Sequence, residues 1–299
     1  MLLKNKYLLI INPVSGDKRG KKWGDKIRAL LHQHMFSIDI LYTKYKNHAK
    51  KLIMTLNPQT YQSILIFGGD GTYNEVINGI LLRKDNYNPI LGFIPGGTGN
   101  AVMHHLGYLD PQKALTPIIN DSQKKIDVMQ INYLNTIEYS INIIGWGMIA
   151  DIGLLSEQMR WLGSLRYIIA SLIYILKLNK RGAKLTIDKK TYNDCYLFIS
   201  ISNTIFTGKG MKISPNAKLD DGLLDVILLS SNITRFQLLK LLPKIFTGGH
   251  ITSKAIEYIN AKNINLQSRN NTMLNIDGEI KGKTPVSVSI LDKKLTIYN

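Results

Sequence analysis

Apolar runs of strand length alternate with helix-like stretches through the first part of the chain. Four short apolar segments are predicted as strands, at residues 7–11, 38–42, 63–67 and 90–94. Helices are predicted between and after them, at residues 22–34, 48–56, 73–82 and from about residue 100. Strands that alternate with helices predict a mostly parallel sheet covered on both faces. Ligands of such sheets bind beyond the carboxyl ends of the strands.

The pattern changes after residue 126, where short β-like runs dominate. These runs lie at residues 128–133, 139–144, 184–187, 196–202, 224–229, 263–267, 273–276 and 286–290. Helical periodicity is confined to residues 156–178 and 235–246. We therefore predict an α/β domain over residues 1–126 and a β-rich domain over 127–299, whose last strand can return to the first domain.

Composition narrows the class of protein. The chain is 44% hydrophobic and 20% charged, which is typical of a globular protein, but its formal net charge is +17. Such a surplus favours polyanionic partners: nucleic acid, anionic membranes or nucleotide phosphates. Nucleic acid is not expected, because no RNA-recognition, zinc-finger or helix-turn-helix pattern occurs. The single cysteine, Cys195, excludes an internal disulfide and favours a reducing, cytoplasmic compartment.

The sharpest chemical signal is the loop Gly68-Gly69-Asp70-Gly71-Thr72, which follows a predicted strand. Glycines let backbone N–H groups approach a phosphate chain, and the following helix adds its positive end. Asp70 would then lie among phosphates, where a carboxylate suits a metal ion or acts as a proton acceptor. The P-loop, the dinucleotide-binding fingerprint and the protein-kinase signatures are absent from the sequence.

Several further segments accompany this loop in a fixed order. They are Asn12-Pro13-Val14-Ser15-Gly16, Thr43 with His48-Ala49, Ile94 to Asn100, Trp146-Gly147, Arg160 to Gly163, Asp220 to Val226, and Asp277-Gly278-Glu279. Together they resemble the diacylglycerol kinase and sphingosine kinase superfamily of lipid kinases over almost the whole chain. The resemblance implies a nucleotide-binding domain like that of phosphofructokinase and NAD kinase, a β-sandwich second domain, and an active site in the cleft between them.

By position, the resemblance implies an ATP-dependent transfer of the γ-phosphate to a primary hydroxyl of a diacylglycerol-like, sphingoid or ceramide-like lipid. It assigns ATP to Asn12, Pro13, Val14, Ser15, Gly16, Thr43, Gly69, Asp70, Gly71, Thr72, Tyr73, Asn74, Glu75 and Thr98. It makes Glu279 the general base, with Asp70 as the rival base or as the organiser of a catalytic Mg²⁺. It also implies a second metal site at Asp221, with the backbone carbonyls of Lys218 and Leu223.

Two positions depart from the pattern of the family. Many bacterial diacylglycerol kinases have an aspartate where this chain has Ala101, so its metal network must differ from theirs. Sphingosine kinases generally place a carboxylate at the position of Gly153, which weakens the argument for a free amine on the substrate. The sequence therefore does not identify the lipid.

Residues 158–190 combine an apolar helical pattern with a surplus of Lys and Arg. Such a helix can lie on an anionic membrane, which would make the protein peripherally membrane-associated. Alternatively, its apolar face packs on the β-rich domain and the lysines are merely solvated. The longest apolar stretch, Tyr167–Leu176, is too short to span a bilayer. The sequence does not determine the oligomeric state, and a homodimer stays open as an expectation.

Two alternative functions remain open at this point. NAD kinases share the glycine loop and the architecture, although the segment that would hold the dinucleotide is not found in this sequence. A lipid- or nucleotide-binding pseudokinase is suggested by Ala101 and opposed by the presence of Asp70 and Glu279.

Overall fold

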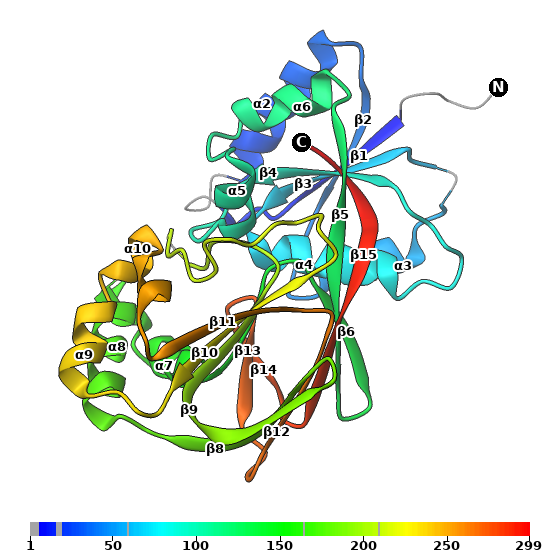
Figure 1. Ribbon diagram of the computed structural model, residues 1–299. Coiled ribbons are helices and arrows are strands. Elements are labelled where there is room, and N and C mark those ends of the chain that lie inside the picture. Colours follow the sequence, from blue (N-terminus) through cyan, green and yellow to red (C-terminus); the bar gives the residue numbers. More distant parts are fainter. Residues whose placement is uncertain (1–5, 16–19, 59, 164, 209) are drawn as a thin grey trace. The chain divides into compact units, whose positions relative to one another are not determined.

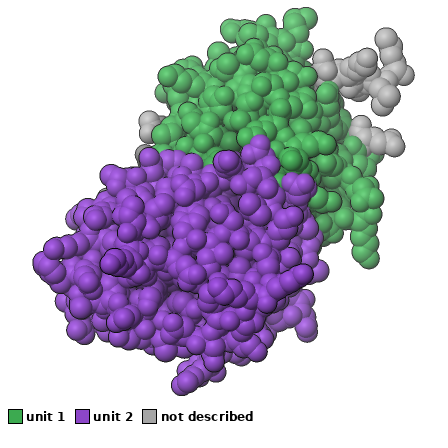
Figure 2. Space-filling view, viewed as in Figure 1, with its two compact units in different colours: residues 1–128, 293–299 green, residues 129–292 purple. Residues whose placement is uncertain are grey.

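The computed structural model describes residues 6–15, 20–58, 60–163, 165–208 and 210–299, which form two compact units (Figures 1 and 2). Unit 1 comprises residues 1–128 together with 293–299, and unit 2 comprises residues 129–292. Two strands, β5 (Gln123–Tyr133) and β15 (Val286–Tyr298), contribute residues to both units.

Unit 1 is built on a parallel sheet with the strand order β15-β4-β3-β1-β2. Its other strands are β1 (Lys6–Ile11), β2 (Ser37–Tyr42), β3 (Ser63–Gly68) and β4 (Ile90–Pro95). Its described helices are α2 (Gly20–Gln33), α3 (His48–Thr55), α4 (Asp70–Leu81), α5 (Ala101–Leu106), η1 (Lys113–Leu115) and α6 (Thr116–Ile119).

The central strands of unit 1 are buried along almost their whole length. Every residue of β3 is buried, as are five of the six residues of β1 and of β4. Helices on both faces of a parallel sheet require such continuous apolar runs. The pairs Ile11↔Phe67, Ile11↔Tyr42 and Gly68↔Pro95 bring the carboxyl ends of the strands level. The loops after β1, β2, β3 and β4 therefore leave the same edge of the sheet.

Unit 2 is β-rich. Its further strands are β6 (Thr136–Ser140), β7 (Ile143–Gly147), β8 (Arg181–Ile187), β9 (Lys190–Ser202), β10 (Leu224–Ser230), β11 (Ile256–Ala261), β12 (Asn263–Ser268), β13 (Met273–Ile276) and β14 (Glu279–Lys283). The first half of β9 pairs with β8, and its second half pairs with β7 and β10. The predicted combination of an α/β unit with a β-rich unit is confirmed.

Alternating side chains divide the interior of unit 2 into two cores. On β10, Leu224, Val226 and Leu228 face a core enclosed by strands, which also holds Trp146. Ile227 and Leu229 face a second core. Four helices of the unit pack on that second core: α7 (Met148–Gln158), α8 (Leu165–Lys177), α9 (Arg235–Leu241) and η3 (Gly249–Thr252). Two short helices contact these helices instead: η2 (Arg160–Leu162) and α10 (Lys244–Thr247). Among the residues that the structure describes, no helix is both long and apolar enough to cross a bilayer.

Three elements predicted for the β-rich part of the chain were wrong because the structure divides each of them, and three predicted strands, β5, β9 and β15, are longer than predicted. The helix predicted at 156–178 begins earlier, at Met148, and is interrupted near Gly163, which has a left-handed φ of 57°. The helix predicted at 235–246 is divided at Pro243, whose ring cannot occupy a helix interior. The strand predicted at 139–144 is two strands, because the Ser140 hydroxyl accepts from the Asn142 N–H (3.0 Å) and the chain turns there.

Candidate active site

Two glycine loops of unit 1 touch backbone to backbone. The loop after β3 contains Gly69, and the loop after β4 contains Gly97. A Cβ atom added at Gly97 would lie 2.5 Å from the Gly69 Cα, so any side chain there would push the loops apart. The Gly96 N–H also donates to the Gly68 carbonyl at 2.7 Å. Glycine is therefore required at this contact for close approach.

The N-terminus of α4 opens beside this contact. Gly69 is the N-cap, and its carbonyl accepts from the N–H groups of Thr72 (2.9 Å) and Tyr73 (3.2 Å). Gly71, in the first turn, is exposed, and a Cβ atom added there would meet nothing within 4 Å. An exposed helix N-terminus with open space over its first turn is a ready binding site for a phosphate group.

Asp70 ties this loop to the next helix. Its two carboxylate oxygens accept from the backbone N–H groups of Ala101 (3.0 Å) and Val102 (3.1 Å) at the N-terminus of α5. Burial raises the pKa of the Asp70 carboxyl, and these hydrogen bonds act in the opposite direction. Both oxygens are thus engaged with backbone donors, which is the geometry of a structural organiser of the loops.

Glu75 plays a similar part for the preceding helix. Its carboxylate accepts from the N–H groups of Asn47 (2.7 Å) and Ala49 (3.0 Å) at the start of α3. Its neighbour Tyr73 is fully buried and donates its hydroxyl to the Ile94 carbonyl at 2.8 Å. The carbonyl of Asn74 accepts from the Asn78 side chain at 2.9 Å. Side chains predicted to contact the nucleotide thus also hold the loops in place.

The loop after β1 lies against the same site. The Asn12 amide donates to the Thr72 hydroxyl at 3.3 Å, which links the loop after β1 directly to the start of α4. The Asn12 side-chain oxygen also accepts from the Val14 N–H at 3.2 Å, and the side chain of Val14 is exposed next to partly exposed Pro13. Ser15 is buried, whereas Gly16 lies outside the described residues.

The remaining predicted contacts lie on neighbouring loops. The Thr43 N–H donates to the Ile11 carbonyl at 2.8 Å, which places Thr43 at the end of β2 beside β1. Thr98 is exposed at the tip of the loop after β4. Gly20 was missed by the sequence analysis: a Cβ there would lie 2.4 Å from the Asn12 carbonyl oxygen, so α2 packs directly on the first loop.

In unit 2, Glu279 is the first residue after a two-residue hairpin turn. Asp277 and Gly278 both have left-handed φ values, 53° and 87°, and Ile276 pairs with Glu279. Asp-Gly is a favoured pair for this tight turn, so the dipeptide was a signal from which the hairpin could have been predicted. The turn fixes Glu279 at the start of β14.

Lys281 connects Glu279 to a second acid that sequence reasoning missed. Its ammonium group lies 3.6 Å from the Glu279 carboxylate and forms an ion pair with Glu138 of β6. Burial by itself would lower the pKa of Lys281, but the surrounding carboxylates, first among them Asp277, raise it. The ammonium therefore stays charged and helps to orient Glu279.

The carboxyl group of Asp277 is buried beneath the hairpin turn. It accepts from the Ser140 hydroxyl at 2.6 Å and from the Ile143 N–H at 3.1 Å. Burial raises the pKa of Asp277 to about 6, although the Lys281 charge and these hydrogen bonds act against the shift. The folded protein therefore binds a proton here more tightly than the unfolded chain does.

This shift predicts a pH dependence of stability. Because the pKa of Asp277 is higher in the folded state, the free energy of unfolding should fall by up to about 3 kcal/mol as the pH rises from 4 to 6. At higher pH this contribution should stay level. Asp277→Asn should remove this component, since asparagine tolerates a left-handed φ and keeps one acceptor oxygen. Urea unfolding of both proteins across this pH range measures the difference. The same pH slope in both proteins would contradict it, and exposed Asp25→Asn is the matched control.

The predicted second metal site lies before β10. Asp221 is exposed and accepts from the Leu223 N–H at 3.1 Å, while Lys218 lies on the same loop. Nearby Asp225, which the sequence analysis did not assign to the metal site, is buried, and its Oδ2 atom has no hydrogen-bond partner among the described residues. Burial raises the pKa of Asp225 to about 6, and the Asp221 charge adds to this. An unpartnered buried carboxylate oxygen beside a second carboxylate fits a hard cation.

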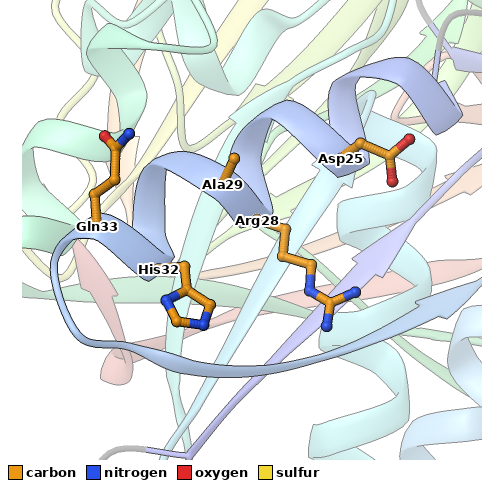
Figure 3. Close-up of a pocket in the computed structure, with 5 residues that line it drawn as sticks. All are labelled: Asp25, Arg28, Ala29, His32 and Gln33. Carbon is orange, nitrogen blue, oxygen red and sulfur yellow. The ribbon is translucent and has the colours of Figure 1, made fainter.

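A hollow of ≈ 580 Å³ opens along α2 (Figure 3). The side chains that line it, Asp25, Arg28, Ala29, His32 and Gln33, all belong to that one helix. It contains none of the loop residues described above. We therefore place no chemistry in it.

Two family models match the chain, one after the other. The diacylglycerol kinase catalytic domain matches residues 6–131, and the YegS C-terminal NAD kinase beta sandwich-like domain matches residues 142–299, more than half of the chain. The chain is 26% identical to a sphingosine kinase of Arabidopsis thaliana over 98% of its own length and 72% of that protein. It is 29% identical to a diacylglycerol kinase of Bacillus subtilis over 93% and 90% of the two chains.

A solved structure gives the same result. A crystal structure of a diacylglycerol kinase from Bacillus anthracis superimposes with a TM-score of 0.79 at 26% identity, and it covers 99% of this chain and 97% of that one. The similarity thus extends through both units, which confirms the predicted fold class.

Proposed function

We propose that this chain, which belongs to the diacylglycerol kinase family of lipid kinases, transfers the γ-phosphate of ATP to a primary hydroxyl group of a membrane lipid. The observation that supports this most strongly is the exposed N-terminus of α4 beside the Gly69–Gly97 contact. It offers N–H donors and a positive helix end to a chain of phosphates. The related diacylglycerol and sphingosine kinases make a lipid alcohol the acceptor.

In this proposal ATP binds along the loops of unit 1. Asn12, Thr72 and the backbone around Gly71 would lie against the phosphates, and the loop tip at Thr98 would close over them. Asp70 and Glu75 would act indirectly, since their carboxylates hold the starts of α5 and α3. The charge of a triphosphate also suits a protein with a net charge of +17.

Glu279 is the proposed general base. Its carboxylate would take the proton from the lipid hydroxyl while that oxygen attacks the γ-phosphorus and ADP leaves with the electron pair of the broken P–O bond. Lys281 supports this role because its ammonium group stays charged. It therefore holds the Glu279 carboxylate in place without giving it a proton. Asp70 is less suited to be the base, because both its oxygens already accept backbone hydrogen bonds.

Mg²⁺ is the proposed metal cofactor. It would neutralise charge on the phosphate oxygens, and Asp70 would organise its surroundings. Ala101 supplies no carboxylate to it, so the metal network would differ from one that has an aspartate at this position. A second, structural ion would be held by Asp221, by the carbonyls of Lys218 and Leu223, and near Asp225.

One assay tests the function. Labelled ATP and Mg²⁺ are incubated with diacylglycerol, ceramide, sphingosine, phosphatidylglycerol and NAD, and labelled products are separated. Label on a lipid supports the proposal, and its position identifies the substrate. Label on NAD alone would overturn it in favour of a soluble NAD kinase. ATP binding without label on any acceptor would instead indicate a pseudokinase.

The structural ion has its own test. Mg²⁺ at about a hundred times its dissociation constant should raise the stability of the nucleotide-free protein by about 2.7 kcal/mol. Asp221→Asn should abolish this gain because it removes a carboxylate ligand, whereas exposed Asp194→Asn should retain it. Thermal unfolding with and without Mg²⁺ measures both. An equal gain in stability with Mg²⁺ in the Asp221→Asn variant would show that Asp221 is not a ligand of the ion.

Since its substrate is a membrane lipid, the protein must also reach a membrane surface. We propose peripheral association with anionic bilayers, which the net charge favours.

A further inference from the structure

Helix α8 has an apolar stripe on its outer surface. Leu165, Ile168, Leu172 and Leu176 follow one another at intervals of three or four residues, so they share one face of the helix. They are 58%, 55%, 40% and 65% exposed, respectively. Ala170 and Ile175 are the buried residues of the same helix. The stripe therefore faces away from the core of unit 2.

Helix α9 extends this stripe. The Arg235 guanidinium donates to the Leu176 carbonyl at the end of α8 (2.7 Å), which holds the two helices together. Ile175 of α8 and Leu238 and Leu241 of α9 enter the same core, so the exposed side of each helix points away from that core. The two helices contact each other and lie on the same side of unit 2 (Figure 1). On that outer side of α9, Phe236 is 65% exposed, and Leu239 is also exposed. Leu165, Ile168, Leu172, Leu176, Phe236 and Leu239 together form what we call the α8–α9 face.

Cations surround this face and acids are absent from its two segments. Residues 158–182 and 232–256 contain no Asp or Glu, but they include Lys177, Lys180, Arg235, Lys240 and Lys244. The ammonium group of Lys240 lies 4.3 Å from the centre of the Phe236 ring, and that of Lys177 lies 5.0 Å from the centre of the Tyr174 ring. Apolar side chains bordered by lysines are typical of surfaces that lie in the interface of an anionic bilayer.

We propose that the α8–α9 face docks onto an anionic lipid bilayer and inserts its apolar side chains below the headgroups. The proposal rests on the proposed function, because a kinase for a membrane lipid must meet a bilayer. A second copy of the chain is a poorer occupant, since a self-complementary contact would oppose lysine to lysine. One acid, Glu157, lies 3.7 Å from the Arg166 guanidinium of α8, but Lys177, Lys240 and Lys244 leave the surplus of charge basic. An exposed apolar surface with a surplus of basic charge around it marks an interaction site for a negatively charged, apolar partner.

Vesicle co-sedimentation tests the docking surface without requiring turnover. The protein should bind phosphatidylcholine vesicles that contain phosphatidylglycerol, and bind weakly to pure phosphatidylcholine, with an affinity that falls at high salt. The double variant Leu172→Gln, Phe236→Gln should bind at least about tenfold more weakly, because each change withdraws a large apolar side chain from the bilayer. Leu134→Gln, at an exposed apolar residue of the β5–β6 turn, is the matched control and should bind normally.

Trp161 supplies a second measurement that does not depend on the double variant. It is 81% exposed and lies just before α8, whereas Trp146 is buried. The fluorescence of Trp161 should shift to the blue when the protein binds anionic vesicles, and Trp161→Phe should abolish the shift. Equal binding of the double variant and the unmodified protein would overturn the proposal. The proposal would also be overturned if sedimentation velocity showed a dimer of the unmodified protein and a monomer of the double variant, since the face would then be a self-association surface. If vesicles bind as predicted but no lipid is phosphorylated, the proposed function fails while the docking surface stands.

Discussion

Replacing Glu279 with glutamine should lower lipid phosphorylation by about 10²–10⁴-fold, the usual contribution of a positioned general base. Glutamine keeps the size and position of the side chain at the start of β14 but cannot accept the hydroxyl proton. The dissociation constant of ATP should change little, because the residues proposed to bind ATP lie in unit 1. Steady-state rates with a lipid substrate and equilibrium ATP titration measure the two effects.

Two controls sharpen this experiment. Glu257→Gln, at an exposed acid of β11, should leave turnover intact and so shows that loss of one negative charge in unit 2 is not the cause. Lys281→Met should lower turnover less than Glu279→Gln does, because it removes only the group that orients the base. Retained activity in Glu279→Gln would move the role of base to Asp70.

Adding one methyl group at Gly71 should weaken ATP binding without weakening the fold. No atom lies within 4 Å of the position of a Cβ there, and alanine is preferred to glycine within a helix. If phosphates bind over the first turn of α4, the methyl group displaces them from the backbone N–H groups. Loss of one hydrogen bond to a charged group, about 1.5–3 kcal/mol, corresponds to roughly ten- to hundredfold weaker binding. ATP titration and thermal unfolding of Gly71→Ala measure the two quantities.

Gly97→Ala gives the contrasting result. Its Cβ would lie 2.5 Å from the Gly69 Cα, so the two loops must separate, and both stability and ATP affinity should fall. Unchanged ATP affinity with Gly71→Ala would show that the phosphates lie elsewhere, and a fall in its stability would contradict the expected tolerance of the fold for this methyl group. The two variants thus distinguish Gly71, where approach of the ligand requires glycine, from Gly97, where packing of the loops requires it.

Local patterns were sufficient where an element is buried on both faces. The runs at residues 7–11, 63–67 and 90–94 predicted β1, β3 and β4 because a central parallel strand has apolar side chains on both sides. Where a glycine or proline interrupts a helical pattern, periodicity alone was insufficient. Gly163 and Pro243 divide segments whose apolar spacing is typical of single helices. Gly163 adopts a left-handed φ that ends a helix, and Pro243 has no N–H and fits only at a helix start.

For the candidate site, the sequence by itself determined the family, the glycine loops and the acids Asp70 and Glu279, because each lies in a short motif whose residues are adjacent in the chain. Only the tertiary structure decided what those acids touch. Asp70 meets α5 and Glu75 meets α3, which lie about 30 residues away in the chain. Lys281, a neighbour of Glu279 on β14, pairs with Glu138 of β6, which lies far away in the sequence. The α8–α9 face likewise depends on tertiary structure, since the side of an amphipathic helix that is covered depends on the core it packs against.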